Sequence, residues 1–210
     1  MNVGIIGAGS VGKGLATGLV KSGHPVVLYA RDEESVRQAA AETGATAASS
    51  LEGVVTSADV VVLAVPFGAV EELARAIRPL VAGKVVIDVT NAAKPDWSGP
   101  LFSGDASAAT TIAGWLPEAR IVKAFNTVFA ANLIAARAAD GQILDALIAG
   151  DDADAKAVVS QLATDLGFRP IDAGLLAGAG LLEGLAWLNI SLNARGGTWQ
   201  SSWKLVGLAA

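Results

Sequence analysis

The feature that most constrains this chain is a group of three glycines directly after its first apolar run. Residues 3–6 are apolar, as in a buried strand, and helix-forming residues follow from 10 to 21. Between them, Gly7-Ala8-Gly9-Ser10-Val11-Gly12 reads G-x-G-x-x-G. At a strand–turn–helix junction, Gly7 permits the tight turn, Gly9 lets backbone approach a pyrophosphate, and Gly12 lets helix and strand pack closely. Because the helix N-terminus also offers free N–H groups, the pattern predicts a dinucleotide-binding turn.

The rest of the chain alternates apolar runs of strand length with longer helical patterns. Further strands are expected at 26–29, 60–65, 84–89, 121–124, 147–150 and 168–171, and helices at 32–41, 69–80, 151–166 and 175–193. Continuous Val/Ile runs joined by helices are typical of a parallel sheet covered on both faces. We therefore predict an α/β fold: a doubly wound parallel sheet of the Rossmann NAD(P)-binding type with a small C-terminal α/β extension.

The chain length of 210 residues fits one continuous globule with two parts. We expect residues 1–150 to form the dinucleotide-binding Rossmann domain and residues 151–210 to form a smaller C-terminal portion. The only long loop-like stretch, at 91–109, is rich in Gly, Pro, Ser and Asp, and loops of that length are often functional. One or two further helical turns are expected between 199 and 208, with Trp199 and Trp203 on one face.

The residues after the second expected strand indicate which nucleotide is preferred. Sites that prefer NAD usually place an acid there to accept a hydrogen bond from the ribose 2′-OH. This chain has the small Ala30 and then Arg31, which can pair with a 2′-phosphate, while Asp32 is better placed as a helix N-cap. The sequence therefore favours NADP(H). Further along, Ala64, Val65 and Pro66 end the central strand, where Pro66 can terminate the strand, contact the cofactor, or both.

Composition excludes several other classes of function. Fifteen Lys and Arg against twenty Asp and Glu give a net charge of −5, with no basic run, so a nucleic-acid partner is not expected. The chain has no Cys and a single His, His24, so no metal site is expected. His24 lies in a Gly-His-Pro turn, and we expect it to be structural or solvated rather than catalytic. No leader or membrane segment is expected, because Glu183 interrupts the most apolar stretch, and we predict a cytoplasmic protein.

A second group of residues follows the strand expected at 121–124. Phe125, Asn126 and Thr127 would leave the carboxyl end of that strand and face the nicotinamide side of the crevice. They can orient a ring, but none is a good general acid or base near neutral pH. Lys123 is expected to pair at the surface. A hydride passed between two cofactor rings needs no such proton donor, whereas reduction of a ketone or imine usually does.

At this point the chain resembles the F420-dependent NADP oxidoreductases, including the similar oxidoreductase domain of the STEAP metalloreductases. The resemblance rests on residues 4–16, Ala64-Val65-Pro66-Phe67, Asp88-Val89-Thr90-Asn91, Lys123-Ala124-Phe125-Asn126-Thr127 and Asp172-Ala173-Gly174 with Glu183 downstream. It implies NADP(H) as cofactor of the domain at 1–150 and F420 or a flavin (FMN or FAD) as second redox partner. It also implies that the small C-terminal portion, residues 151–210, closes the cleft in which the two rings meet. By position, Gly7, Gly9, Ser10, Val11, Gly12, Ala30, Arg31, Ala64, Val65, Pro66, Asn91 and Ala124 would serve the cofactor, and Asn91, Phe125, Asn126 and Thr127 would lie near the ring-to-ring contact.

Two departures from the family pattern bear on the second partner. The archaeal F420 enzymes have His at the position of Asn126, so this block is more similar to the STEAP version. Many relatives carry Arg at the position of Gly180. Two other functions stay open: an NADPH-dependent reductase of a small carbonyl or imine, and a non-catalytic NADP(H)-sensing module. Leucines at helical spacing between 175 and 192 are typical of core or of a dimer contact, and we expect a homodimer through the C-terminal helices.

Overall fold

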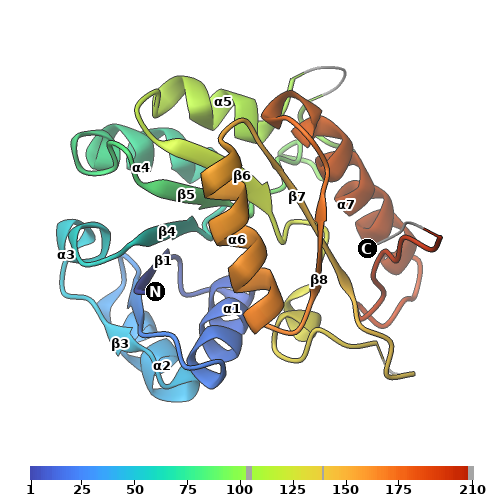
Figure 1. Cartoon of the computed structure of the whole chain (residues 1–210), viewed down its shortest axis with the longest axis horizontal. Helices are drawn as coiled ribbons and strands as arrows, with labels where there is room; N and C mark the ends of the chain where they lie inside the picture. The colour runs from blue at the N-terminus through green and yellow to red at the C-terminus, as the bar shows by residue number, and fades with distance from the viewer. Residues whose placement is uncertain (103–105, 139, 208–210) are drawn as a thin grey trace.

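The computed structural model describes residues 1–102, 106–138 and 140–207, and it contains one eight-stranded sheet with helices on both faces (Figure 1). The strand order is β3-β2-β1-β4-β5-β6-β7-β8. The strands are β1 (Val3–Ile6), β2 (Val26–Tyr29), β3 (Thr46–Ala47), β4 (Val60–Leu63), β5 (Val85–Asp88), β6 (Arg120–Ala124), β7 (Asp145–Gly150) and β8 (Arg169–Asp172). The central strands β1, β4 and β5 are buried along their whole length, which explains their continuous apolar sequences.

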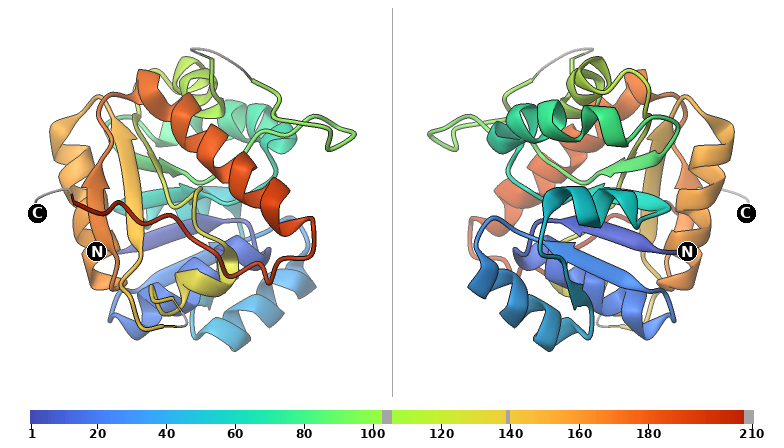
Figure 2. Two further views of the ribbon diagram at one scale, coloured as in Figure 1. Left: turned by 90° about the vertical axis from the view of Figure 1, so that its right-hand side faces the viewer. Right: turned by 90° about the vertical axis from the view of Figure 1, so that its left-hand side faces the viewer.

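Two apolar clusters hold the helices against the sheet, one on each face. One cluster includes residues of α1 (Ser10–Lys21), α2 (Glu33–Thr43) and α6 (Ala153–Asp165), and the other includes residues of α3 (Leu51–Thr56), α4 (Val70–Ile77) and α5 (Ala108–Trp115). Short 3₁₀ helices occur at η1 (Phe67–Ala69), η2 (Arg78–Leu80), η3 (Ala130–Leu133) and η4 (Leu176–Gly178). The final helix, α7 (Ala179–Asn193), crosses one side of the molecule beside α5 (Figure 2). The predicted doubly wound α/β fold is confirmed.

The sheet is parallel except at one pairing, where β7 runs antiparallel to β6. The register brings Ala124 opposite Ile148 and Val122 opposite Gly150. A parallel return would need a crossover, usually a helix, that carries the chain back over one face of the sheet. In the described part of the segment between these strands, η3 is the only helical element, so the chain re-enters the sheet from the same edge. The helix α6 then makes the parallel crossover to β8.

Four elements were not predicted: the strand β3, the 3₁₀ turn η3, and the α-helices α3 and α5. Both helices begin at a serine whose side chain accepts from the backbone N–H three residues on, Ser50 from Gly53 and Ser107 from Thr110. These caps are the signal that could have located them. The start of α5 falls at the end of the loop expected at 91–109, of which residues 103–105 lie outside the described part of the chain.

The helical turns expected at 199–208 are also wrong over the described residues 199–207, which form an extended C-terminal strap; Leu208 lies outside the described residues. Gly196 and Gly197 follow the end of α7, and the strap then runs back along the molecule (Figure 2). Its backbone is held by side chains from elsewhere: Asn132 donates to the carbonyl of Gln200 at 2.9 Å and Asn189 to that of Ser201 at 3.2 Å. Side-chain bonds of this kind replace the i to i−4 ladder of a helix.

Two remaining expectations concern His24 and the membrane. The His24 ring contacts an Asp165 carboxylate oxygen at 2.9 Å through Nε2, which ties the turn before β2 to the end of α6, so a structural role is confirmed. Within the described residues, every helix is too short or too polar to cross a lipid bilayer.

Candidate active site

The glycine turn lies where the strand order reverses, between β1 and β4. In open α/β sheets ligands bind in the crevice at this switch point, beyond the carboxyl ends of the strands. Gly7 has a φ of 127°, and a Cβ there would lie 2.1 Å from the Ala64 carbonyl oxygen. A Cβ at Gly12 would lie 2.0 Å from the carbonyl oxygen of Gly7. Gly9 differs, because a Cβ there would meet no atom within 4 Å. Gly7 and Gly12 therefore serve close packing, whereas the surface at Gly9 is open to a ligand.

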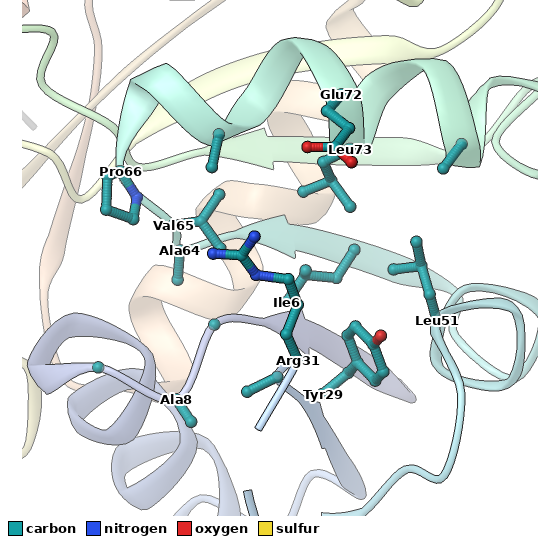
Figure 3. A pocket seen from close by; sticks show the side chains of 15 residues that line it. Ile6, Ala8, Tyr29, Arg31, Leu51, Ala64, Val65, Pro66, Glu72 and Leu73 are labelled. Atoms are coloured by element: carbon teal, nitrogen blue, oxygen red, sulfur yellow. The ribbon is translucent and has the colours of Figure 1, made fainter. Parts of the chain in front are cut away.

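A cavity of about 360 Å³, here called the switch-point cavity, opens beside this turn (Figure 3). Seven of the predicted cofactor residues line it: Gly7, Gly9, Ala30, Arg31, Ala64, Val65 and Pro66. Its other walls come from residues that were not predicted, among them Tyr29, Leu51 and Leu73. Leu51 belongs to α3 and Leu73 to α4. The cavity forms where these helices pack over the edge of the sheet, and the local sequence of either helix contains no pattern that predicts it.

The guanidinium of Arg31 lies over the switch-point cavity, between Val65 and Leu73 in Figure 3. The side chain is exposed and forms no ion pair with any described residue. Its neighbour Asp32 caps α2, where its carboxylate accepts the Ser35 N–H at 2.8 Å. The hydrogen bonds from the Ser35 hydroxyl and N–H lower the pKa of Asp32. Asp32 thus caps the helix, as expected, while the Arg31 guanidinium makes no ion pair within the described part of the chain.

A larger cavity of about 880 Å³ lies on the other side of the start of α1. Six of the predicted site residues line it: Ser10, Val11, Asn91, Phe125, Asn126 and Thr127. Four further aromatic side chains, which were not predicted for the site, also line it: Trp97, Phe129, Trp187 and Trp199. We call it the aromatic cavity. Of the predicted cofactor residues, Gly12 and Ala124 line neither cavity, and Ala124 is fully buried at the end of β6.

The aromatic walls are paired with one another across chain segments. The rings of Trp97 and Trp187 stack, with centroids 6.5 Å apart and planes at 24°. Phe129 meets Trp199 of the strap edge to face, with centroids 5.3 Å apart. Because these residues come from the loop after β5, from α7, from the segment after β6 and from the strap, only the folded chain assembles the cavity.

Two asparagines join the carboxyl ends of β5 and β6 at the floor of this cavity. The Asn91 side-chain amide donates to the backbone oxygen of Asn126 at 2.8 Å, and the Asn126 amide donates to the side-chain oxygen of Asn91 at 2.9 Å. The preceding residue, Phe125, has a φ of 62° although it is not glycine, which is a strained conformation. Strained backbone conformations of this kind are common at binding and active sites, where they orient side chains toward a ligand.

The structure corrects the expectation for Lys123, whose side chain is fully buried rather than paired at the surface. Its Nζ lies 2.9 Å from a carboxylate oxygen of Asp88 on β5 and 2.9 Å from one of Glu183 on α7. The Glu183 oxygens also accept the N–H groups of Ala108 and Ala109 at the start of α5, at 3.1 and 3.3 Å. Lys123 is buried because its side chain lies on the inward-facing side of β6. The buried ammonium group is tolerated because two carboxylates, of Asp88 and Glu183, pair with it.

A glycine turn at the switch point of a doubly wound sheet, with a second cavity beside it, is the architecture of a dinucleotide-dependent oxidoreductase. The model of the family described as "NADP oxidoreductase coenzyme F420-dependent" matches residues 2–92. The F420-dependent NADP reductase of Methanothermobacter thermautotrophicus strain Delta H is 34% identical over 93% of this chain and 90% of its own length. The chain belongs to this family, and with it to the NADP-dependent oxidoreductases.

Two further similarities extend the comparison. The metalloreductase STEAP3 of Rattus norvegicus is 34% identical over 87% of this chain, but the chain spans only 36% of that relative's length. The crystal structure of a candidate F420-dependent NADP reductase from Arthrobacter sp. FB24 superposes with a TM-score of 0.87 at 28% identity, covering 97% of this chain and 98% of that one. The predicted resemblance is therefore confirmed.

Proposed function

We propose that the protein transfers a hydride between NADP(H) and a flat tricyclic partner, coenzyme F420 or a flavin. The observation that supports this most is the pair of cavities on either side of the glycine turn. Gly7 and Gly9 line the switch-point cavity, and Ser10 and Val11, the next residues in sequence, line the aromatic cavity. A dinucleotide laid over the N-terminus of α1 would therefore reach from one cavity into the other.

The chain's own residues would hold the nucleotide as follows. Arg31 would pair with the 2′-phosphate, and Leu51, Leu73 and Pro66 would contact the adenosine. The pyrophosphate would lie on the open surface at Gly9, where the first N–H groups of α1 would donate hydrogen bonds to it. When bound, NADP(H) supplies the hydride carrier and the second ring its redox partner.

The residues at the carboxyl ends of β5 and β6 would position the two rings. Asn91 and Asn126 are locked together by two hydrogen bonds, so their remaining polar atoms have a defined direction. Phe125, Thr127 and the surrounding aromatic walls would keep water away and press the rings together. No Asp, Glu, His or Lys is among the described residues that line the aromatic cavity, which suits a transfer that needs no proton donor from the protein.

The C-terminal portion, residues 151–210, would close the cleft. Trp187 on α7 and Trp199 on the strap both face the aromatic cavity. The strap is fastened to β7 by Asp145, whose carboxylate accepts the Leu205 N–H at 2.7 Å. Closure by these elements would complete the binding site for the second ring.

Rapid mixing with NADPH and each of F420, FMN and FAD tests the proposal. We expect absorbance changes that report reduction of at least one ring and oxidation of NADPH in equal amounts. If no ring is reduced but a small ketone or cyclic imine is, the carbonyl or imine reductase replaces this function. If NADPH binds and nothing is reduced, the chain is an NADP(H)-sensing module.

We also infer that two copies associate through α7. Leu181, Leu188 and Leu192 are exposed by 76%, 47% and 53%, and with Leu185 they follow the alternating four- and three-residue spacing of a helix–helix contact. Light scattering after gel filtration should give a dimer mass. The change Leu188→Glu should give a monomer, and a monomeric wild-type protein would contradict the inference.

A further inference from the structure

We propose that the aromatic cavity selects a ring system that carries an anionic side chain, and that Arg195 binds this anion. The inference rests on the proposed function and goes further, because it names a specificity residue and the chemistry that it recognises. Arg195 follows the end of α7 and lines the aromatic cavity. Of the described residues that line this cavity, it is the only charged one.

An arginine just beyond a helix C-terminus has an ordinary alternative role, in which it donates to the last carbonyl groups of the helix. Backbone N–H groups already fill that role here. Ala194 donates to the carbonyl of Ile190 at 2.9 Å, and Gly196 and Gly197 donate to that of Asn193 at 3.1 and 2.8 Å. Within the described residues, the Arg195 guanidinium makes no hydrogen bond to a helix carbonyl. Capping therefore does not explain this side chain.

A second ordinary role would be an ion pair with a neighbouring acid. Two other arginines in the second half of the chain have one: Arg120 lies 3.8 Å from Asp152, and Arg169 lies 2.8 Å from Asp145. Arg137 donates to the carbonyl of Gly141 instead. For Arg195 no acidic oxygen of residues 1–102, 106–138 or 140–207 lies within ion-pair distance. An exposed, unpaired guanidinium at the rim of an otherwise uncharged cavity creates a local positive potential there.

The chemistry of the walls defines the rest of the ligand. Trp97, Trp187 and Trp199 supply flat apolar surface, and polar contacts come from amides and hydroxyls such as Asn189 and Ser191. Aromatic stacking selects the ring, whereas a guanidinium selects phosphate or carboxylate through paired N–H donors. The phosphate of FMN and the phosphodiester and carboxylates of F420 share this chemistry.

The test compares ring systems that differ only in their anionic group, using the full chain loaded with NADP⁺. Dissociation constants are measured by fluorescence for FMN against riboflavin, and for F420 against its deazaflavin chromophore with only a ribityl chain. We expect the anionic member of at least one pair to bind about tenfold more tightly, as a charge-assisted hydrogen bond implies. The pair that shows the preference identifies which of the two anions is recognised.

Three variants assign the effect to the residue. Arg195→Ala should abolish the preference and leave the affinity for riboflavin or the ribityl chromophore unchanged. Arg195→Lys should keep part of it, because the charge remains and the paired donors are lost. The control Arg75→Ala removes an exposed arginine of α4 that pairs with Glu71 at 3.0 Å and lines neither cavity, and it should change nothing.

The outcomes separate this inference from the proposed function. If Arg195→Ala weakens both members of a pair equally, or if the wild-type protein shows no preference in either pair, Arg195 does not bind the anion. In that case NADPH could still reduce the ring lacking the anion, and the proposed function would stand. If the preference is present and depends on Arg195 but NADPH reduces no ring, the binding inference holds and the redox function is wrong.

Discussion

The Nζ of Lys123 lies 2.9 Å from a carboxylate oxygen of Glu183, and this contact ties the central sheet to α7. The lysine is on β6, and the same Nζ is 2.9 Å from Asp88 on β5. Glu183 in turn accepts two N–H groups from the start of α5, where the helix dipole favours an anion. One buried group of charges thus joins β5, β6, α5 and α7.

The first prediction concerns the stability of this buried group. Lys123→Met would leave Asp88 and Glu183 buried without a cation, and we expect a loss of about 3–5 kcal/mol in the free energy of unfolding. Glu183→Gln should cost less, because Lys123 keeps Asp88 as its partner. Urea unfolding at pH 7 measures both. Equal stability of Lys123→Met and the wild-type protein would show that the group contributes nothing.

The second prediction separates the packing glycines from the binding glycine. Gly7→Ala should prevent folding or destabilise strongly, because of the 127° φ and the 2.1 Å approach to Ala64. Gly9→Ala should change the unfolding free energy by less than about 0.5 kcal/mol, since its Cβ meets no atom. It should nevertheless weaken NADPH binding, measured by calorimetry, by about tenfold or more, because the methyl group would occupy the pyrophosphate's place. Unchanged affinity in Gly9→Ala would place the pyrophosphate elsewhere.

The third prediction concerns the choice of nucleotide. Arg31→Ala should lower kcat/KM for NADPH by about tenfold or more through loss of a charge-assisted bond to the 2′-phosphate, with little change for NADH. The control Arg75→Ala should leave both values unchanged. Steady-state kinetics with each nucleotide gives the ratio. A ratio that survives the loss of Arg31 would mean that the 2′-phosphate is recognised by another residue.

The fourth prediction is a pH dependence that arises at Asp145. Burial acts to raise the pKa of this carboxyl, but hydrogen bonds from Arg169, the Leu205 N–H and Lys204 outweigh it, so the pKa is lowered. A lowered pKa in the folded state means that the carboxylate stabilises the fold above its ordinary value in an unfolded chain, about 3.9. That stabilisation is lost as the pH falls through that value towards the lower pKa of the folded state.

Two variants measured by urea unfolding at pH 7 and at lower pH test this dependence. Asp145→Asn should be less stable than the wild-type protein at pH 7 by about 1–3 kcal/mol, and the difference should shrink as the pH falls. The exposed control Asp140→Asn, whose carboxylate accepts hydrogen bonds from Gln142 alone among the described residues, should follow the wild-type curve. A difference that stays constant with pH would show that ionisation of Asp145 is not the cause.

The parts of the site that sequence could locate are those written as local patterns. The glycine turn, Arg31 at the end of β2 and Asp32 as an N-cap depend on residues adjacent in the chain, and the structure places each as expected. The block from Phe125 to Thr127 was likewise found from its place after a strand. The roles of Gly9 and Arg31 in binding are predictions that the variants above test.

The errors arise where a residue's environment depends on distant segments. Lys123 looked like a surface residue because a lone lysine is costly to bury, and its two acids come from β5 and α7. The direction of β7 depends on whether a helix carries the chain back across the sheet before that strand. The extended conformation of the strap depends on hydrogen bonds from the side chains of Asn132 and Asn189.

The sequence by itself determined the α/β class and the position of the glycine turn, because hydrophobic period and glycine spacing act over a few neighbouring residues. Only the tertiary structure decided the aromatic cavity, the burial of Lys123 and the place of Arg195 at the edge of that cavity. Each of these is created by surfaces that meet from separate elements, and the free energy of such contacts depends on burial and charge partners that no local pattern records.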